Sequence, residues 1–158
     1  MIEALMYSML LWMGANCAAI DGIHPKHNPC QYNYNVKLPK VTFLSQKDLK
    51  YEFYSRGSKS NGRGVKADLY GFYRETEEKI FLENTWKRFN VNDKATLFHE
   101  LFHHVQFKNV RRDEMLCISH VEVPTILFEK KYINSLGRSH KIYLHLFDNP
   151  CNVYYKGI

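Results

Sequence analysis

The most apolar part of the chain lies near its N-terminus. Residues 4–19 are almost wholly apolar and end in small residues, a pattern typical of the apolar core and cleavage region of a secretory signal. Glu3 stands where such signals carry positive charge, and the run is short for a membrane span. Two interpretations follow: residues 1–19 are a signal peptide or membrane-proximal anchor, or they form an apolar N-terminal helix that packs on the protein.

After an irregular lead-in at residues 21–39, apolar and polar positions alternate in short stretches. Alternation of this kind between turn-forming residues indicates β-strands. The pattern predicts these elements in chain order: a strand at 41–45, a short helix at 46–54, a glycine-containing loop at 56–64, a strand at 65–73, a turn at 74–78 and a strand at 79–83. The last two strands are expected to form a hairpin.

The second half of the chain changes to a helical period. Apolar residues within 94–108 recur at i, i+1, i+4, i+5 and i+8, which predicts a helix with one buried stripe, and Asn92 or Asp93 is a suitable N-cap. A second helix is predicted over residues 120–136, ending at Gly137. Strands followed by helices indicate a single α+β domain over residues 20–158.

Composition agrees with one folded domain and argues against a nucleic-acid partner. The chain has 158 residues, of which 45% are hydrophobic and 24% charged, so it carries enough apolar side chains for a core. The net charge of +6 comes from Lys and Arg residues scattered along the chain. That distribution favours a solvated surface over a nucleic-acid-binding patch, and we expect no nucleic-acid partner.

The cysteines bear on the compartment in which the protein works. Cys17, Cys30, Cys117 and Cys151 are widely spaced and form no C-x-x-C pair, so a zinc ribbon is disfavoured and disulfides or buried thiols are expected. Together with the apolar N-terminus they favour a secreted or periplasmic protein, with a cytoplasmic location as the alternative. The spacing leaves the disulfide pairing open.

The most specific motif lies inside the first long predicted helix. His99, Glu100 and His103 form an H-E-x-x-H. Two histidines four residues apart lie on one face of a helix, one turn apart, so their imidazoles can bind the same Zn²⁺. Glu100 follows about 100° around the helix, where its carboxylate can help deprotonate a water whose pKa zinc lowers to roughly 7. The motif therefore predicts a zinc site.

A catalytic zinc needs a third protein ligand and an open position for water. A third histidine of the metzincin kind is excluded, because Gln106 and Asn109 stand where glycine and histidine would be required. Glu122 is the favoured third ligand, since a helix that crosses back over the first would bring its early turns to the metal. Glu114 and Glu129 remain the rival carboxylates.

Parts of the sequence carry a family resemblance: residues 67–71, residues 79–82, the run at 97–106 that contains H-E-x-x-H-H-x-Q, Cys117 and Glu122. They resemble the small gluzincin metallopeptidases, compact relatives of thermolysin. The chain is most similar to a minigluzincin-like bacterial group with an HELxHHxQ active-site helix. It departs from that group at Pro124, where an alanine and an aromatic residue usually follow the glutamate.

The resemblance implies a small zincin-like domain, in which a short sheet with an edge hairpin packs on the H-E-x-x-H helix and a second helix carries the glutamate. It implies that His99, His103 and Glu122 bind one Zn²⁺ and that Glu100 is the general base. It also implies that an edge strand pairs with an extended peptide, the residues of this strand being Lys79, Ile80, Phe81, Leu82 and Glu83.

Weaker candidates are residues that would hydrogen-bond a ligand or stabilise the oxyanion formed when water attacks a carbonyl: His104, His140, His145 and Tyr143. We expect a zinc-dependent metalloendopeptidase that hydrolyses an extended peptide or protein substrate. The alternative is a non-catalytic binding module whose zinc contributes to folding. A Glu100→Gln variant distinguishes the two, because the enzyme would retain its zinc and lose cleavage.

Overall fold

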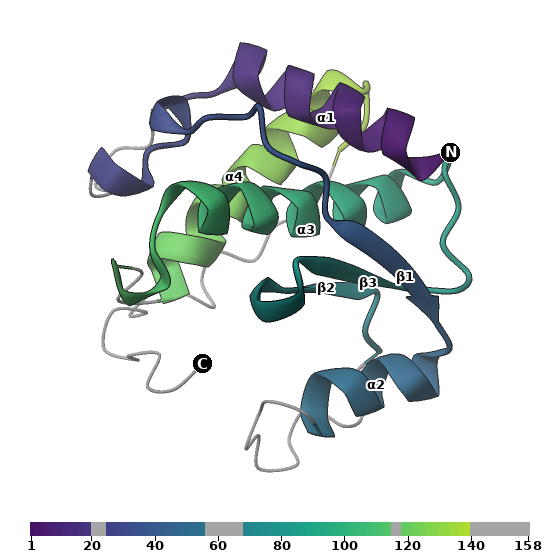
Figure 1. Ribbon diagram of the computed structural model, residues 1–158. Helices are drawn as coiled ribbons and strands as arrows, with labels where there is room; N and C mark the ends of the chain where they lie inside the picture. The colour runs from purple at the N-terminus through teal and green to yellow at the C-terminus, as the bar shows by residue number, and fades with distance from the viewer. Residues whose placement is uncertain (20–24, 56–67, 115–117, 140–158) are drawn as a thin grey trace.

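A computed structural model describes residues 1–19, 25–55, 68–114 and 118–139 (Figure 1). Within these residues the protein is a small α+β domain with a three-stranded mixed sheet, as the sequence predicts. The elements in chain order are α1 (Ile2–Asn16), η1 (Pro25–His27), η2 (Pro29–Gln31), β1 (Lys40–Leu44), α2 (Gln46–Ser55), β2 (Gly71–Arg74), η3 (Glu75–Glu77), β3 (Lys79–Glu83), α3 (Val91–Asn109), η4 (Arg112–Glu114) and α4 (Ile118–Ser135).

The sheet has the strand order β1-β3-β2, so β3 is its central strand. It pairs in parallel with β1 and antiparallel with β2. The prediction that Lys79–Glu83 is an edge strand is therefore wrong. Three consecutive residues of β3, Ile80, Phe81 and Leu82, are buried, because the strand is covered on both faces and packs apolar side chains into each.

The predicted hairpin forms, although its first strand is shorter than expected. Of the predicted strand at 65–73, residues 71–73 belong to β2, residues 68–70 are not in a strand, and residues 65–67 lie outside the described part, as does the predicted loop at 56–64. The turn contains η3 and ends at Glu78, whose φ of 47° is left-handed. The antiparallel register pairs Phe72 with Phe81, and their rings stack on one face of the sheet.

Helix α3 lies at the centre of the molecule, between the sheet and helices α1 and α4 (Figure 1). Its side chains are buried on several faces, including Phe98, Phe102, His103 and His104, so the predicted single apolar stripe describes only part of its surface. The N-cap is Asn90, not Asn92 or Asp93, because the Asn90 side chain accepts from the amides of both. Helix α4 ends close to the predicted Gly137, which has a φ of 72°.

The apolar N-terminal run forms helix α1, which packs against α3 (Figure 1). Met6, Met9 and Met13 are almost completely buried, and Trp12 contacts the aromatic rings of α3 and α4. Cys17 and Cys30 form a disulfide just beyond the end of the helix. Among the described residues no helix is long and apolar enough to cross a membrane. Removal of residues 1–19 as a signal peptide stays a prediction, and it would take away Cys17 together with the buried side chains of α1.

Candidate metal centre

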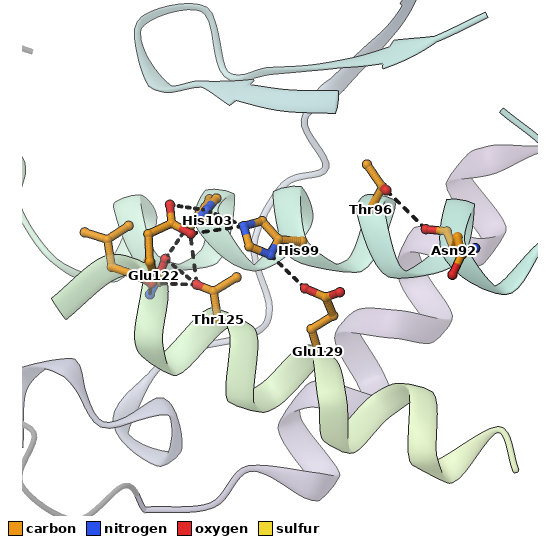
Figure 2. Close-up of polar contacts among 9 residues, drawn as sticks. Asn92, Thr96, His99, His103, Glu122, Thr125 and Glu129 are labelled. Carbon is orange, nitrogen blue, oxygen red and sulfur yellow. Dashed lines mark hydrogen bonds and ion pairs between the residues drawn. The ribbon is translucent and has the colours of Figure 1, made fainter. Parts of the chain in front are cut away.

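Two histidines of α3 and one glutamate of α4 bring their donor atoms together (Figure 2). The Nε2 atoms of His99 and His103 lie 3.0 Å apart. The two carboxylate oxygens of Glu122 lie 3.2 Å from these nitrogens, Oε2 near His99 and Oε1 near His103. The helical spacing places both imidazoles on one face of α3, and α4 crosses that face with Glu122 in its second turn.

These separations fit a metal ion. Ligands held at about 2.0–2.1 Å by a tetrahedral zinc lie about 3.3 Å from one another, close to the 3.0 Å and 3.2 Å between the donors here. Two imidazoles and one carboxylate are also a donor set that zinc takes when a fourth position is left for water. The side chains of His99 and Glu122 are 20% and 23% exposed, so solvent reaches the cluster.

The three carboxylates that the sequence leaves as alternative ligands occupy different positions in the structure. Glu122 lies in the donor cluster. Glu114 is in η4 and forms a 2.9 Å ion pair with Lys26, and its carboxylate is not part of the cluster found among the described residues. Glu129 contacts the ring nitrogen of His99 that is not part of the cluster, since its Oε2 atom lies 2.8 Å from the Nδ1 atom.

Glu129 fixes the orientation of the His99 ring. A carboxylate accepts hydrogen bonds, so the Nδ1 atom of His99 donates to Glu129 and its Nε2 atom is directed toward the cluster. Sequence reasoning considered Glu129 only as a rival ligand. Glu122 and Glu129 are seven residues apart, two helical turns, and therefore lie on one face of α4; this spacing was the signal for their joint role.

The charges within the cluster support one another. Burial opposes protonation of His99 and His103, but hydrogen bonding and proximity to Glu122 outweigh it and raise the pKa of both imidazoles. Burial also acts to raise the pKa of the Glu122 carboxyl, yet the two imidazoles hold that pKa far below its usual range. Glu122 is therefore ionised, as a carboxylate ligand must be.

Glu100 lies next to His99 on α3 and is only 8% exposed. Burial raises the pKa of its carboxyl group, while His99 and His103 oppose that rise. A carboxylate with a raised pKa is a stronger base than an exposed one, and it holds an abstracted proton more firmly. The predicted general base thus combines closeness to the charged cluster with an environment that suits proton transfer.

The weaker predicted candidates lie away from the donor cluster or outside the described residues. His104 is completely buried, and its ring bonds the Tyr73 hydroxyl at 2.9 Å and the main-chain oxygen of Lys37 at 2.8 Å. It is a structural residue between α3, β2 and the segment before β1. His140, Tyr143 and His145 belong to the part that the structure does not describe, as do the remaining cysteines, Cys117 and Cys151.

Comparison with known proteins gives one family. A family model described as a domain of unknown function (DUF6647) matches residues 27–147. No curated protein and no solved structure matches the chain. The matched region contains the sheet, α3, α4 and every residue of the donor cluster, whereas α1 precedes it.

Proposed function

Because the chain belongs to the DUF6647 family, whose function is unknown, we propose from its site alone that it is a gluzincin-type zinc metalloendopeptidase with a zincin-like fold. The observation that carries the proposal is the convergence of His99, His103 and Glu122: the two Nε2 atoms lie 3.0 Å apart, and each lies 3.2 Å from one carboxylate oxygen of Glu122. Glu100 is close enough for its charge to interact with both histidines. The H-E-x-x-H motif predicts the roles of His99, Glu100 and His103, and the family resemblance implies that of Glu122.

Each residue has a defined task in peptide hydrolysis. His99, His103 and Glu122 hold the metal, and Glu129 keeps His99 in the required orientation. Zinc, when bound, polarises a carbonyl group and lowers the pKa of water. Glu100 takes the proton of the attacking water and returns it to the leaving amine, which its desolvated carboxylate supports.

A strand of the sheet is the proposed partner of the peptide substrate, but it is not β3. Among the described residues β2 pairs with β3 along one side only, and it packs beside α3. Its other side offers main-chain groups to an extended peptide near the helix that carries His99 and His103. We therefore assign the substrate-pairing role to Gly71–Arg74 in place of Lys79–Glu83.

The disulfide between Cys17 and Cys30 supports the expected secreted or periplasmic location, because disulfides persist in oxidising compartments. An extracytoplasmic peptidase would meet unfolded or flexible segments of other proteins as substrates. Peptide or protein substrates remain the expected partners.

The experiment that tests the proposal is the substitution Glu100→Gln. Glutamine preserves the shape of the side chain but cannot accept the proton, so cleavage of an unfolded protein by the zinc-loaded variant should fall about 10²–10⁴-fold. Zinc content, measured by atomic absorption, should stay at one ion per chain. Glu114→Gln is the matched control, since Glu114 lies at the surface in an ion pair with Lys26, and it should cleave at the wild-type rate.

A second function is supported by the position of the cluster between two helices. His99 and His103 come from α3 and Glu122 from α4, so a metal there would also join the helices of a non-catalytic binding module. The same experiment separates the two. A zinc-loaded wild type that cleaves no unfolded protein, or a Glu100→Gln variant as fast as the wild type, would rule out the peptidase.

A further inference from the structure

Gln106 is a completely buried polar residue one turn beyond His103 on α3. Its Oε1 atom lies 2.8 Å from the Nδ1 atom of His103, and its Nε2 atom donates to the main-chain oxygen of Val121 at 2.8 Å. One carboxamide therefore touches a residue of the donor cluster on α3 and, on α4, the residue immediately before Glu122. A buried amide with both ends bonded to such partners holds them in a fixed relation.

The chemistry of the partners decides which end of the amide faces which group. The main-chain oxygen of Val121 only accepts, so the amide nitrogen of Gln106 must lie against it. Oε1 then faces His103 and can only accept, so the Nδ1 atom of His103 carries the hydrogen. In the neutral imidazole that binds a metal, the lone pair is then on the His103 Nε2 atom, which is directed at His99 and Glu122.

The side-chain bonds to Val121 lie in the turn of α4 that precedes Pro124. A proline removes the donor for the main-chain oxygen four residues earlier, here at position 120, and bends the helix. The Val121 oxygen is bonded by two side chains, the Thr125 hydroxyl at 2.7 Å and the Gln106 amide at 2.8 Å. The Thr125 hydroxyl also lies 3.2 Å from the Gln106 Oε1 atom. Thr125 itself lies close to Glu122 (Figure 2).

We propose that Gln106 is a positioning residue of the metal site: it sets the tautomer of His103 and, through Val121, holds the first turns of α4 so that Glu122 faces the two histidines. This inference rests on the metal site of the proposed function and not on peptide cleavage. It holds equally if the domain binds zinc without turnover.

The test compares zinc binding of Gln106→Met with that of Asn109→Met. Methionine fills the space of glutamine but makes neither hydrogen bond. Asn109 is the matched control, since its carboxamide also bridges α3 to a distant main-chain segment, at Asn33, but contacts no donor of the cluster. Zinc affinity, measured by competition with a chelator, should fall 10–100-fold in Gln106→Met and less than twofold in Asn109→Met.

A second readout reports the His103 ring directly. In the zinc-loaded wild type, nitrogen-15 NMR should show a slowly exchanging Nδ1–H on His103. This signal should be lost in Gln106→Met and restored in Gln106→Glu, because a carboxylate again accepts from Nδ1.

Three results would overturn the inference. One is wild-type zinc affinity in Gln106→Met, and another is an equal loss of affinity in Asn109→Met. The third is the absence of the His103 Nδ1–H signal in zinc-loaded Gln106→Glu. This result can be obtained even if Gln106→Met does not fold. Failure of peptide cleavage alone would count against the peptidase and leave this inference intact.

Discussion

His104 follows directly after His103 in the sequence, yet its ring belongs to a different network. Its Nε2 atom donates to the main-chain oxygen of Lys37, so its Nδ1 atom accepts from the Tyr73 hydroxyl. Burial lowers the pKa of His104, which keeps the ring neutral and able to accept. The two bonds tie α3 to β2 and to the segment before β1.

Removing the Tyr73 hydroxyl should therefore destabilise the fold without disturbing the metal site. Tyr73→Phe leaves the Nδ1 atom of His104 buried with no donor, which costs about 1–3 kcal/mol of unfolding free energy. Urea denaturation measures this loss, and zinc affinity should be unchanged. Tyr70→Phe is the control, because Tyr70 is 61% exposed and should stay within about 0.5 kcal/mol of the wild type. Equal losses in the two variants would contradict the role of His104.

At the scale of residues, the sequence predicts those contacts of the site that lie within a single helix. The spacing of His99 and His103 is fixed by the helical repeat, so their convergence needs no knowledge of the fold. Glu122 could be favoured but not chosen outright, because its position depends on how α4 crosses α3. The contact of Glu129 with His99 and the bond from Gln106 to Val121 depend on the same crossing, and the pattern of apolar residues does not encode them. The contact of Gln106 with His103 lies within α3, where the helical repeat brings residues three apart together.

At the scale of elements, β2 approaches its neighbours closely at Gly71. A Cβ atom there would lie 2.9 Å from the Leu82 Cδ2 atom, the Phe81 main-chain oxygen and the Thr96 Cγ2 atom. The Phe81 oxygen belongs to the central strand and cannot rotate away. Gly71→Ala should therefore push β2 away from β3 and α3 and lower the unfolding free energy by about 1–3 kcal/mol.

Gly14 in α1 provides the opposite case. A Cβ atom at this position meets nothing closer than the Tyr34 side chain at 3.7 Å, an ordinary contact. Because alanine is the better helix former, Gly14→Ala should raise the unfolding free energy by up to about 1 kcal/mol. Thermal unfolding of both variants checks the pair. A Gly71→Ala protein as stable as Gly14→Ala would show that β2 can shift without cost.

The strands show where periodicity stops being informative. Alternating stretches and short apolar runs locate β1, β3 and the hairpin, because they report which residues face the core. They do not report which strands are neighbours, and the parallel pairing of β1 with β3 follows from the path of the chain through α2. The three consecutive apolar residues of β3 nevertheless indicate a strand covered on both faces. This disagrees with the edge position that the family resemblance implies for the strand.

At the scale of the whole molecule, the candidate metal site lies on a helix that is also the centre of the core. The apolar side chains of α1, α3 and α4 form one cluster, and the polar groups around His103 are enclosed beside it. The disulfide links the end of α1 to η2. Closing a loop of this length lowers the conformational entropy of the unfolded chain, which adds about 3 kcal/mol to the unfolding free energy. The sequence predicted an apolar N-terminal segment but could not say that its methionines pack against α3.

This arrangement predicts that metal binding and global stability are coupled. Zinc at a hundred times its dissociation constant should add about 2.7 kcal/mol to the unfolding free energy, which for a domain of this size raises Tm by about 5–11 °C. Differential scanning calorimetry with and without a chelator measures the shift. His103→Ala removes a ligand and should abolish it. Glu100→Gln should keep the full shift, because Glu100 acts on water and is not a ligand; a lost shift in that variant would place Glu100 among the residues that hold the metal.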